Sequence, residues 1–82
     1  MPYLYILTSL KELKTYVGST DRTLEVRLAE HNAGRSTFTR LYRPWKVMYF
    51  EYFFDLAEAR LREKYFKTAA GRRKIKKIFI RE

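Results

Sequence analysis

Short apolar runs separated by polar turns fill the first 20 residues of the chain. The segments YLYILTS (residues 3–9) and KTYVGST (residues 14–20) are rich in aromatic and β-branched side chains, and the polar stretch LKEL separates them. This pattern predicts the two strands of a β-hairpin. If the hairpin closes symmetrically about Leu10 and Lys11, Tyr5 lies opposite Tyr16 and both side chains point to one face.

A helical pattern follows over residues 22–33. Asp21 and Thr23 are both candidates for its N-cap, and Gly34 is suited to end it in a left-handed conformation. The positions spaced i, i+3, i+4 and i+7 on its apolar stripe are Leu24, Arg27, Leu28 and His31. An amphipathic helix normally buries this stripe, so its arginine and histidine need an explanation.

The second half of the chain predicts one more strand and one more long helix. WKVMYFEYFF (residues 45–54) is apolar on both faces, so both sides of the sheet should be covered. Asp55 and Glu58 form a capping-box pattern at the start of a helix that we expect Gly71 to break, before a last helical turn or two in RRKIKKIFI. Glu63 falls on the apolar arc of the long helix. The elements together predict a small α/β sandwich, in the α+β sense.

Length and composition narrow the class of protein. A chain of 82 residues predicts one domain over residues 1–82, and the absence of cysteine excludes disulfides, a thiol nucleophile and a cysteine-based zinc site. The first ten residues are too short for a membrane span and lack the features of a signal peptide, so we expect a cytoplasmic protein that does not enter a membrane. The net charge of +9 favours binding to nucleic acid. The alternatives are a soluble domain that is basic without such a partner, and binding to an anionic membrane surface.

Polar side chains from two strands and two helices could converge on one site. These are Tyr5, Tyr16, Arg27, His31 and Glu63. A single Mg²⁺ held by Glu63, waters and a substrate phosphate would compensate the carboxylate. Arg27 could neutralise charge on the phosphate, and His31 could pass protons or orient a tyrosine. This set is suited to cutting a phosphodiester bond.

Simpler interpretations of the same residues stay open. Buried tyrosines are most often core residues with a satisfied hydroxyl. Arg27 could form a salt bridge with Glu63 between two helices, which would explain why both charged residues lie on apolar helix faces without any catalytic role. A histidine near the end of a helix is often a capping or surface residue.

The ordered motifs resemble those of the GIY-YIG nuclease family, in particular its small single-domain members. They are YLY at residues 3–5, YVG at residues 16–18, RLAEHNAG at residues 27–34 and AEARLREKYFKTAAGRR at residues 57–73. The resemblance spans nearly the whole chain. It implies a three-stranded antiparallel sheet flanked by helices, and hydrolysis of DNA with one divalent metal, Mg²⁺ or Mn²⁺.

The resemblance also implies a role for each matching residue. Glu63 would be the metal ligand and Arg27 the electrostatic stabiliser, while Tyr5 and Tyr16 would position or deprotonate the attacking water and His31 would assist a tyrosine. Tyr3 replaces the first glycine of the family motif and shares a face with Tyr5. Leu4 and Val17 replace its isoleucines and should point to the opposite face.

Basic and aromatic residues outside these motifs are candidates for holding DNA. The candidates are Arg35, Phe38, Arg40, Tyr42 and Arg43 in the loop-like segment 34–44, together with Arg72 and Arg73 in RRKIKK. Arginines can meet phosphates while an aromatic ring stacks on a base. An ordinary solvated loop and a packed helix with a solvated basic face are the alternatives.

The sequence therefore predicts a metal-dependent DNA endonuclease and leaves open its preference for DNA structure, its use of RNA and its oligomeric state. The alternative is a nucleic-acid-binding module that has the nuclease scaffold without significant catalysis.

Overall fold

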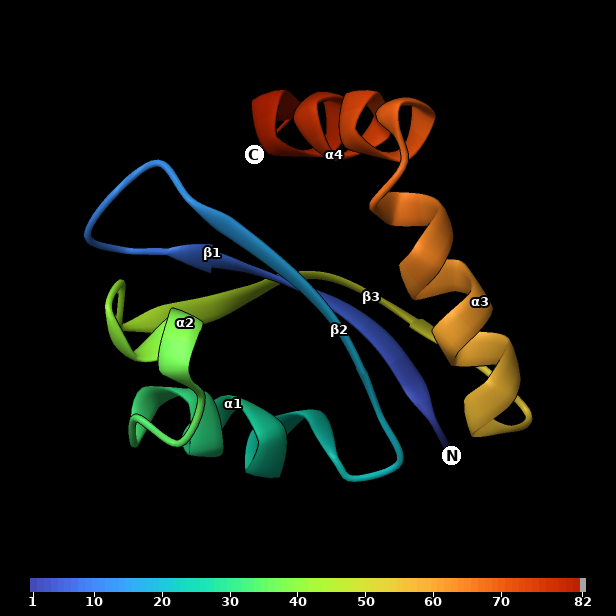
Figure 1. Ribbon diagram of the computed structural model, residues 1–82, viewed down its shortest axis with the longest axis horizontal. Helices are drawn as coiled ribbons and strands as arrows, with labels where there is room; N and C mark the ends of the chain where they lie inside the picture. Colours follow the sequence, from blue (N-terminus) through green and yellow to red (C-terminus); the bar gives the residue numbers. More distant parts are fainter. Residues whose placement is uncertain (82) are drawn as a thin grey trace.

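The computed structural model describes residues 1–81, with the side chains of residues 80 and 81 left out. A three-stranded antiparallel sheet in the order β2-β1-β3 lies at its centre (Figure 1). The strands are β1 (Tyr3–Ser9), β2 (Thr15–Thr20) and β3 (Trp45–Tyr52). The helices are α1 (Leu24–Asn32), α2 (Thr37–Arg40), α3 (Leu56–Phe66) and α4 (Ala69–Arg81). This architecture confirms the predicted α+β fold with helices on both sides of an antiparallel sheet.

The sheet separates two apolar clusters, because residues along β1 alternate between its faces. Leu4 and Ile6 pack with Val17, Phe66 and Ile75 on the face covered by α3 and α4. The residues that directly follow each of them in β1 pack on the other face, against α1 and the segment that follows it. Those residues are Tyr5 and Leu7, with Trp45, Tyr16, Leu24, Leu28 and Tyr42 around them. Leu4 and Val17 therefore do point away from the tyrosines, as the alternation predicts.

The hairpin register differs from the predicted one by two residues. Tyr5 lies opposite Gly18, and Tyr16 lies opposite Leu7. The predicted pairing of Tyr5 with Tyr16 is wrong because the turn is longer than two residues, with the Ser9 amide donating to the Lys14 carbonyl. A shift of two residues preserves the face of every side chain, so the rings of Tyr5 and Tyr16 still lie together, with centroids 6.4 Å apart.

The first helix begins and ends close to the predicted residues. Thr23 is its N-cap, and the hydroxyl of Thr23 accepts a hydrogen bond from the Val26 amide at 3.2 Å. Gly34 has a φ of 87° directly after the helix, as a left-handed terminator requires. The segment 34–44 is less loop-like than expected, because it contains the short helix α2.

The break in the second helical region lies earlier than predicted. Asp55 caps α3 through the Glu58 amide at 2.9 Å, as the capping-box pattern predicts, but the helix ends at Phe66. Gly71 does not break a helix, since it lies within α4. A side chain at Gly71 would overlap the backbone of Tyr65 and Phe66, so this glycine permits the close approach of α4 to the end of α3.

Asn32 occupies part of the free edge of β3. Its side-chain oxygen accepts from the Trp45 amide at 2.7 Å, and its side-chain nitrogen donates to the Trp45 carbonyl at 3.1 Å. The end of α1 thus satisfies the first outward-facing backbone groups of an edge strand, which fixes α1 against the sheet.

Candidate active site

Tyr5, Arg27 and His31 form a hydrogen-bonded group on the face of the sheet covered by α1. The Tyr5 hydroxyl lies 2.9 Å from Nε2 of His31 and accepts from Nε of Arg27 at 3.1 Å. Tyr5 is 1% exposed and His31 is 0% exposed. The structure therefore brings these three predicted site residues together and explains the polar residues on the apolar stripe of α1, which satisfy a buried tyrosine.

Burial sets the protonation of this group. Burial raises the pKa of Tyr5 to about 12, although nearby Arg27 opposes the shift. Burial, reinforced by Arg27, lowers the pKa of His31 to about 4. Near pH 7 both side chains are therefore neutral, whereas Arg27 is charged.

Arg27 is fixed by its own helix rather than by Glu63. Its Nη1 donates to Glu30 at 2.9 Å, and Glu30 also accepts from Arg22 at 2.6 Å. Burial alone would lower the pKa of Arg27, but the hydrogen bonds to Glu30 and Tyr5 raise it. The side chain of Arg27 stays 29% exposed. The alternative of an Arg27–Glu63 salt bridge is wrong, because each side chain has other partners.

Glu63 lies on the opposite side of β2. One carboxylate oxygen accepts from the Ser19 hydroxyl at 2.5 Å, and the other pairs with Nζ of Lys67 at 2.8 Å. The side chain is 23% exposed. The carboxylate is thus compensated by a hydrogen bond and an ion pair, and it remains accessible from the surface.

The two halves of the site meet at the free edge of β2. Gly18 lies between them, and a side chain there would meet the Tyr5 hydroxyl at 2.5 Å and Cε2 of Tyr16 at 3.0 Å. A groove of about 390 Å³ runs past the end of this strand from α1 to α3. Its polar lining includes Ser19 and Arg27, with Arg22, Arg35 and Arg60 around them. Arg27 and the serine that holds Glu63 therefore face the same space.

A second groove, of about 470 Å³, begins beside Tyr16 and continues along the same edge. Phe38 of α2 stacks on Tyr16 there, with ring centroids 6.1 Å apart and planes inclined by 27°. Lys67 and Arg72 line the other side. An aromatic pair facing two cations across a groove is suited to bases and phosphates.

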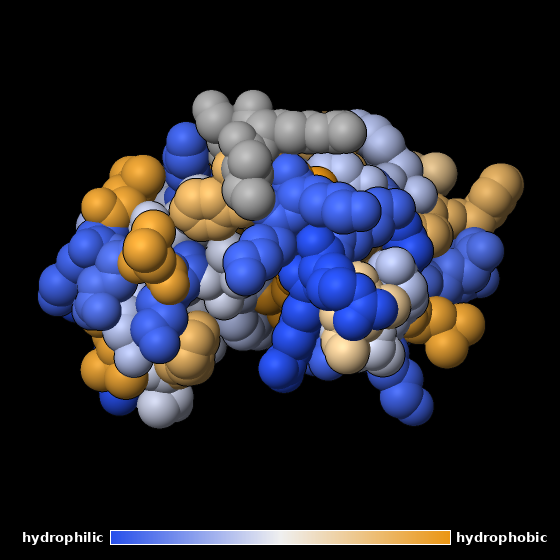
Figure 2. All heavy atoms as spheres, turned by 90° about the horizontal axis from the view of Figure 1, so that it is seen from above, coloured by the Kyte–Doolittle hydropathy of each residue, from blue (hydrophilic) through white to orange (hydrophobic). Residues whose placement is uncertain are grey.

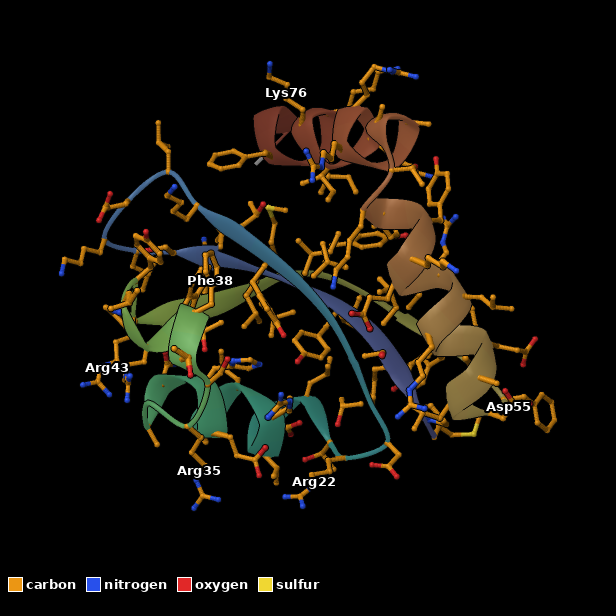
Figure 3. The ribbon with its side chains drawn as sticks, in the orientation of Figure 1. Arg22, Arg35, Phe38, Arg43, Asp55 and Lys76 are labelled. Atoms are coloured by element: carbon orange, nitrogen blue, oxygen red, sulfur yellow. The ribbon has the colours of Figure 1, made fainter. Side chains whose placement is uncertain are left out.

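The other predicted DNA contacts are distributed over the surface. Arg35, Arg40 and Arg43 are exposed, and Arg22 and Arg35 project from the side of the molecule below α1 (Figure 3). Tyr42 packs against Phe38, with ring centroids 5.3 Å apart. Arg73 lies apart from Arg72, in a separate hollow that Tyr65 lines. Hydrophilic side chains gather over α4, as Figure 2 shows.

Comparison with known proteins identifies the fold. The family model described as the GIY-YIG catalytic domain matches residues 1–76. The chain belongs to the GIY-YIG family. It is 39% identical over 79 residues to a UPF0213 protein of Clostridium perfringens, covering 95% of this chain and 83% of that protein. It is 38% identical over 77 residues to a UPF0213 protein of Staphylococcus haemolyticus, covering 93% and 92%. No solved structure matches it significantly.

Membership of the GIY-YIG family indicates a nuclease, and GIY-YIG nucleases generally use a divalent metal. Within residues 1–81 no three His, Asp or Glu side chains are grouped to hold a metal. Glu63 nevertheless fits such an ion, because Mg²⁺ is often held by one or two carboxylates together with water and substrate phosphates. The described part of the chain has no helix long and apolar enough to cross a membrane.

Sequence reasoning missed four partners of the GIY-YIG residues. Lys67 could have been found, since it follows Glu63 by one helical turn. Ser19 follows Gly18, and strand alternation places it on the face opposite Tyr16. Glu30 lies one turn after Arg27. Thr39 carries no comparable signal, because its segment resembles a loop; its Oγ1 lies 2.7 Å from Nδ1 of His31.

Proposed function

We propose that this protein is a metal-dependent DNA endonuclease that hydrolyses phosphodiester bonds. The observation that carries the proposal is the groove that Arg27 and Ser19 share. Arg27 is charged and partly exposed, and Ser19 holds the only carboxylate that we assign to the metal. Membership of a nuclease family gives the class of reaction. The groove supplies a cationic surface where a phosphate could bind.

Arg27 is suited to bind the reacting phosphate. Its Nε and Nη1 are used by Tyr5 and Glu30, and among residues 1–81 no acceptor lies at its Nη2. Nη2 can therefore donate to a phosphate oxygen as negative charge grows in the transition state. Tyr5 and Glu30 hold the guanidinium in place, so its orientation is set before substrate binds.

Tyr16 is the tyrosine that we assign to the attacking water. It is partly exposed and lines the groove beside Phe38, whereas Tyr5 is buried. Tyr16 would orient the water by a hydrogen bond at its hydroxyl. Tyr5 and His31 are then positioning residues that act through Arg27, because a buried hydroxyl does not reach a solvent-borne substrate.

Glu63 would hold Mg²⁺ or Mn²⁺, whose chemistry when bound is to neutralise charge on the phosphate and the leaving oxygen. Ser19 would orient the Glu63 carboxylate through its hydroxyl. Lys67 would give up its ion pair with Glu63 and be free for a neighbouring phosphate of the DNA.

One observation favours the second candidate, a nucleic-acid-binding module without significant catalysis. Lys67 already neutralises the Glu63 carboxylate, and the grooves on either side are cationic. Such a protein would bind DNA through its grooves without cutting it.

A conservative change at Glu63 separates the two candidates. Glu63→Gln keeps the size of the side chain and an acceptor for Ser19, but it removes the charge that a divalent ion requires. We expect cleavage of a DNA panel containing nicked, branched and flapped duplexes to fall at least about 100-fold. DNA affinity and melting temperature should stay close to those of the parent. The matched control is Glu58→Gln, an exposed change on the same helix.

Rates would be measured with Mg²⁺, with Mn²⁺ and with a chelator. A Glu63→Gln protein that cuts as fast as the parent would contradict the assignment of Glu63. A parent that binds DNA tightly but cuts none of the panel with either metal would support the binding module instead.

A further inference from the structure

Thr39 lies deep in the protein on a helix that otherwise faces the surface. It is fully buried, while its neighbours Phe38 and Arg40 are exposed candidates for contact with nucleic acid. Its carbonyl accepts from Nε1 of Trp45 at 2.7 Å, which anchors α2 to the start of β3. Its hydroxyl lies 2.7 Å from Nδ1 of His31. Among the described residues, the bond between Thr39 and His31 is thus the one side-chain hydrogen bond that joins α2 to the Tyr5–His31 pair.

The hydrogen bonds around Tyr5 indicate which nitrogen of His31 carries the proton. The Tyr5 oxygen accepts from Arg27, so its own hydroxyl proton requires an acceptor inside a buried site. Nε2 of His31, at 2.9 Å, is the acceptor that the described residues offer. A neutral imidazole has one donor and one acceptor nitrogen, so the proton of His31 must then lie on Nδ1. Nδ1 in turn donates to Thr39.

We propose that Thr39 is a positioning residue that holds His31 in the tautomer with its proton on Nδ1, and thereby keeps Tyr5 and Arg27 in their working arrangement. Without the Thr39 hydroxyl, a proton on Nδ1 would have no acceptor in a buried pocket. A proton on Nε2 would instead leave the Tyr5 hydroxyl proton unpaired, so neither tautomer would satisfy the buried groups and the ring would no longer be confined to one of them. This role rests on the proposed function, because it acts through the arginine assigned to the phosphate.

Three substitutions test the role. Thr39→Val removes the hydroxyl at nearly constant volume, and Thr39→Ser restores a hydroxyl at the same atom. Thr37→Val makes the same chemical change at an exposed position of the same helix and serves as control. His31 is the only histidine of the chain, so the ¹⁵N signals of its ring can be assigned without ambiguity.

We expect the parent, Thr39→Ser and Thr37→Val to show a His31 ring protonated on Nδ1, and Thr39→Val to show a mixture of the two neutral tautomers. The single-turnover cleavage rate of folded Thr39→Val should fall about 10- to 100-fold, by analogy with the loss of hydrogen-bond partners that orient metal-bound histidines. Thr39→Ser should regain most of the rate, and substrate affinity should not change.

Several results would overturn the proposal. A parent protein whose His31 is protonated on Nε2 would overturn it. This measurement needs no variant, so it decides the question even if Thr39→Val does not fold. A Thr39→Val protein with an unchanged tautomer, or with a changed tautomer and an unchanged rate, would also overturn it. If the parent cuts no DNA, the proposed function and the catalytic consequence fail together, while the NMR spectra still decide whether Thr39 holds the ring.

Discussion

Tyr5 and His31 are buried, and they act on the surface by holding the Arg27 side chain in place. Neither side chain is accessible, yet the Tyr5 hydroxyl fixes Nε of an arginine that opens onto a groove. A core tyrosine with a satisfied hydroxyl and a functional tyrosine were alternatives in the sequence. In the structure Tyr5 is a satisfied core residue, and this same property lets it orient Arg27.

The first residue-scale prediction concerns Arg27→Ala. Tyr5 would keep its hydrogen bond with His31, and Glu30 would keep Arg22 at 2.6 Å, so no charge is left uncompensated. We expect the free energy of unfolding to fall by only about 1 kcal/mol. The cleavage rate should fall about 10²- to 10³-fold, because transition-state stabilisation is lost.

The measurements are urea unfolding and a single-turnover rate at one salt and metal concentration. Arg27→Lys, which keeps the charge but loses the planar fork, should recover only part of the rate. A loss of about 3 to 5 kcal/mol with undiminished cleavage by the folded fraction would mean that Arg27 serves the fold alone.

The second concerns the pH dependence of stability. The unfolded chain binds a proton at His31 with a pKa of about 6.5, whereas burial lowers the pKa of native His31 to about 4. Between these values the unfolded state holds more protons, so the free energy of unfolding should decrease as the pH falls from about 6.5 to 4. The total loss should be about 3 kcal/mol, with no further loss from His31 below pH 4.

Urea unfolding at pH 7.5, 6.5, 5.5 and 5.0 would measure this slope. His31→Gln should remove most of it, since the chain has no other histidine. An equal slope in both proteins would contradict the placement of a neutral histidine in the core.

At the scale of elements, α2 shows most clearly what the sequence could not predict. The pattern of residues 34–44 lacks helical periodicity, so it predicts a loop, and four residues are too few to reveal a helix. The two hairpin strands were predictable from alternation, but their register was not, because it depends on the length of the turn. In the sequence, Gly71 suggests the end of a helix. In the structure, a glycine is required there because α4 approaches the end of α3 closely.

The segment around α2 also carries the prediction for nucleic acid binding. If Arg35, Arg40 and Arg43 each meet a phosphate of duplex DNA, replacing any one by alanine should lower the slope of log affinity against log salt concentration by about 0.9. Binding would be measured by fluorescence anisotropy at four salt concentrations.

Lys77→Ala is the charge-matched control for this series, because Lys77 lies in the hollow beside Tyr65 and away from α2. If the control lowers the slope and none of the three arginine variants does, the phosphate-binding surface lies on α4 instead.

At the scale of the whole molecule, basic side chains project from two opposite sides of the protein. Lys76 projects from α4 on the side opposite Arg22 and Arg35 (Figure 3). The net charge of +9 predicted a polyanionic partner but not this distribution, which depends on how α4 turns across the end of α3. The candidate site residues were chosen from ordered motifs in the sequence. Their division between the two faces of β2 could not be predicted, because it depends on tertiary packing that brings Ser19 to Glu63.

The position of the candidate site on an edge strand restricts how this sheet can be extended. A fourth strand beside β2 would cover the tyrosine half and the carboxylate half at once, since they lie on the two sides of that strand. At the other edge, Asn32 already occupies the first backbone groups of β3. Under the proposed function, the exposed backbone of β2, which in other proteins invites aggregation, would instead face the nucleic acid.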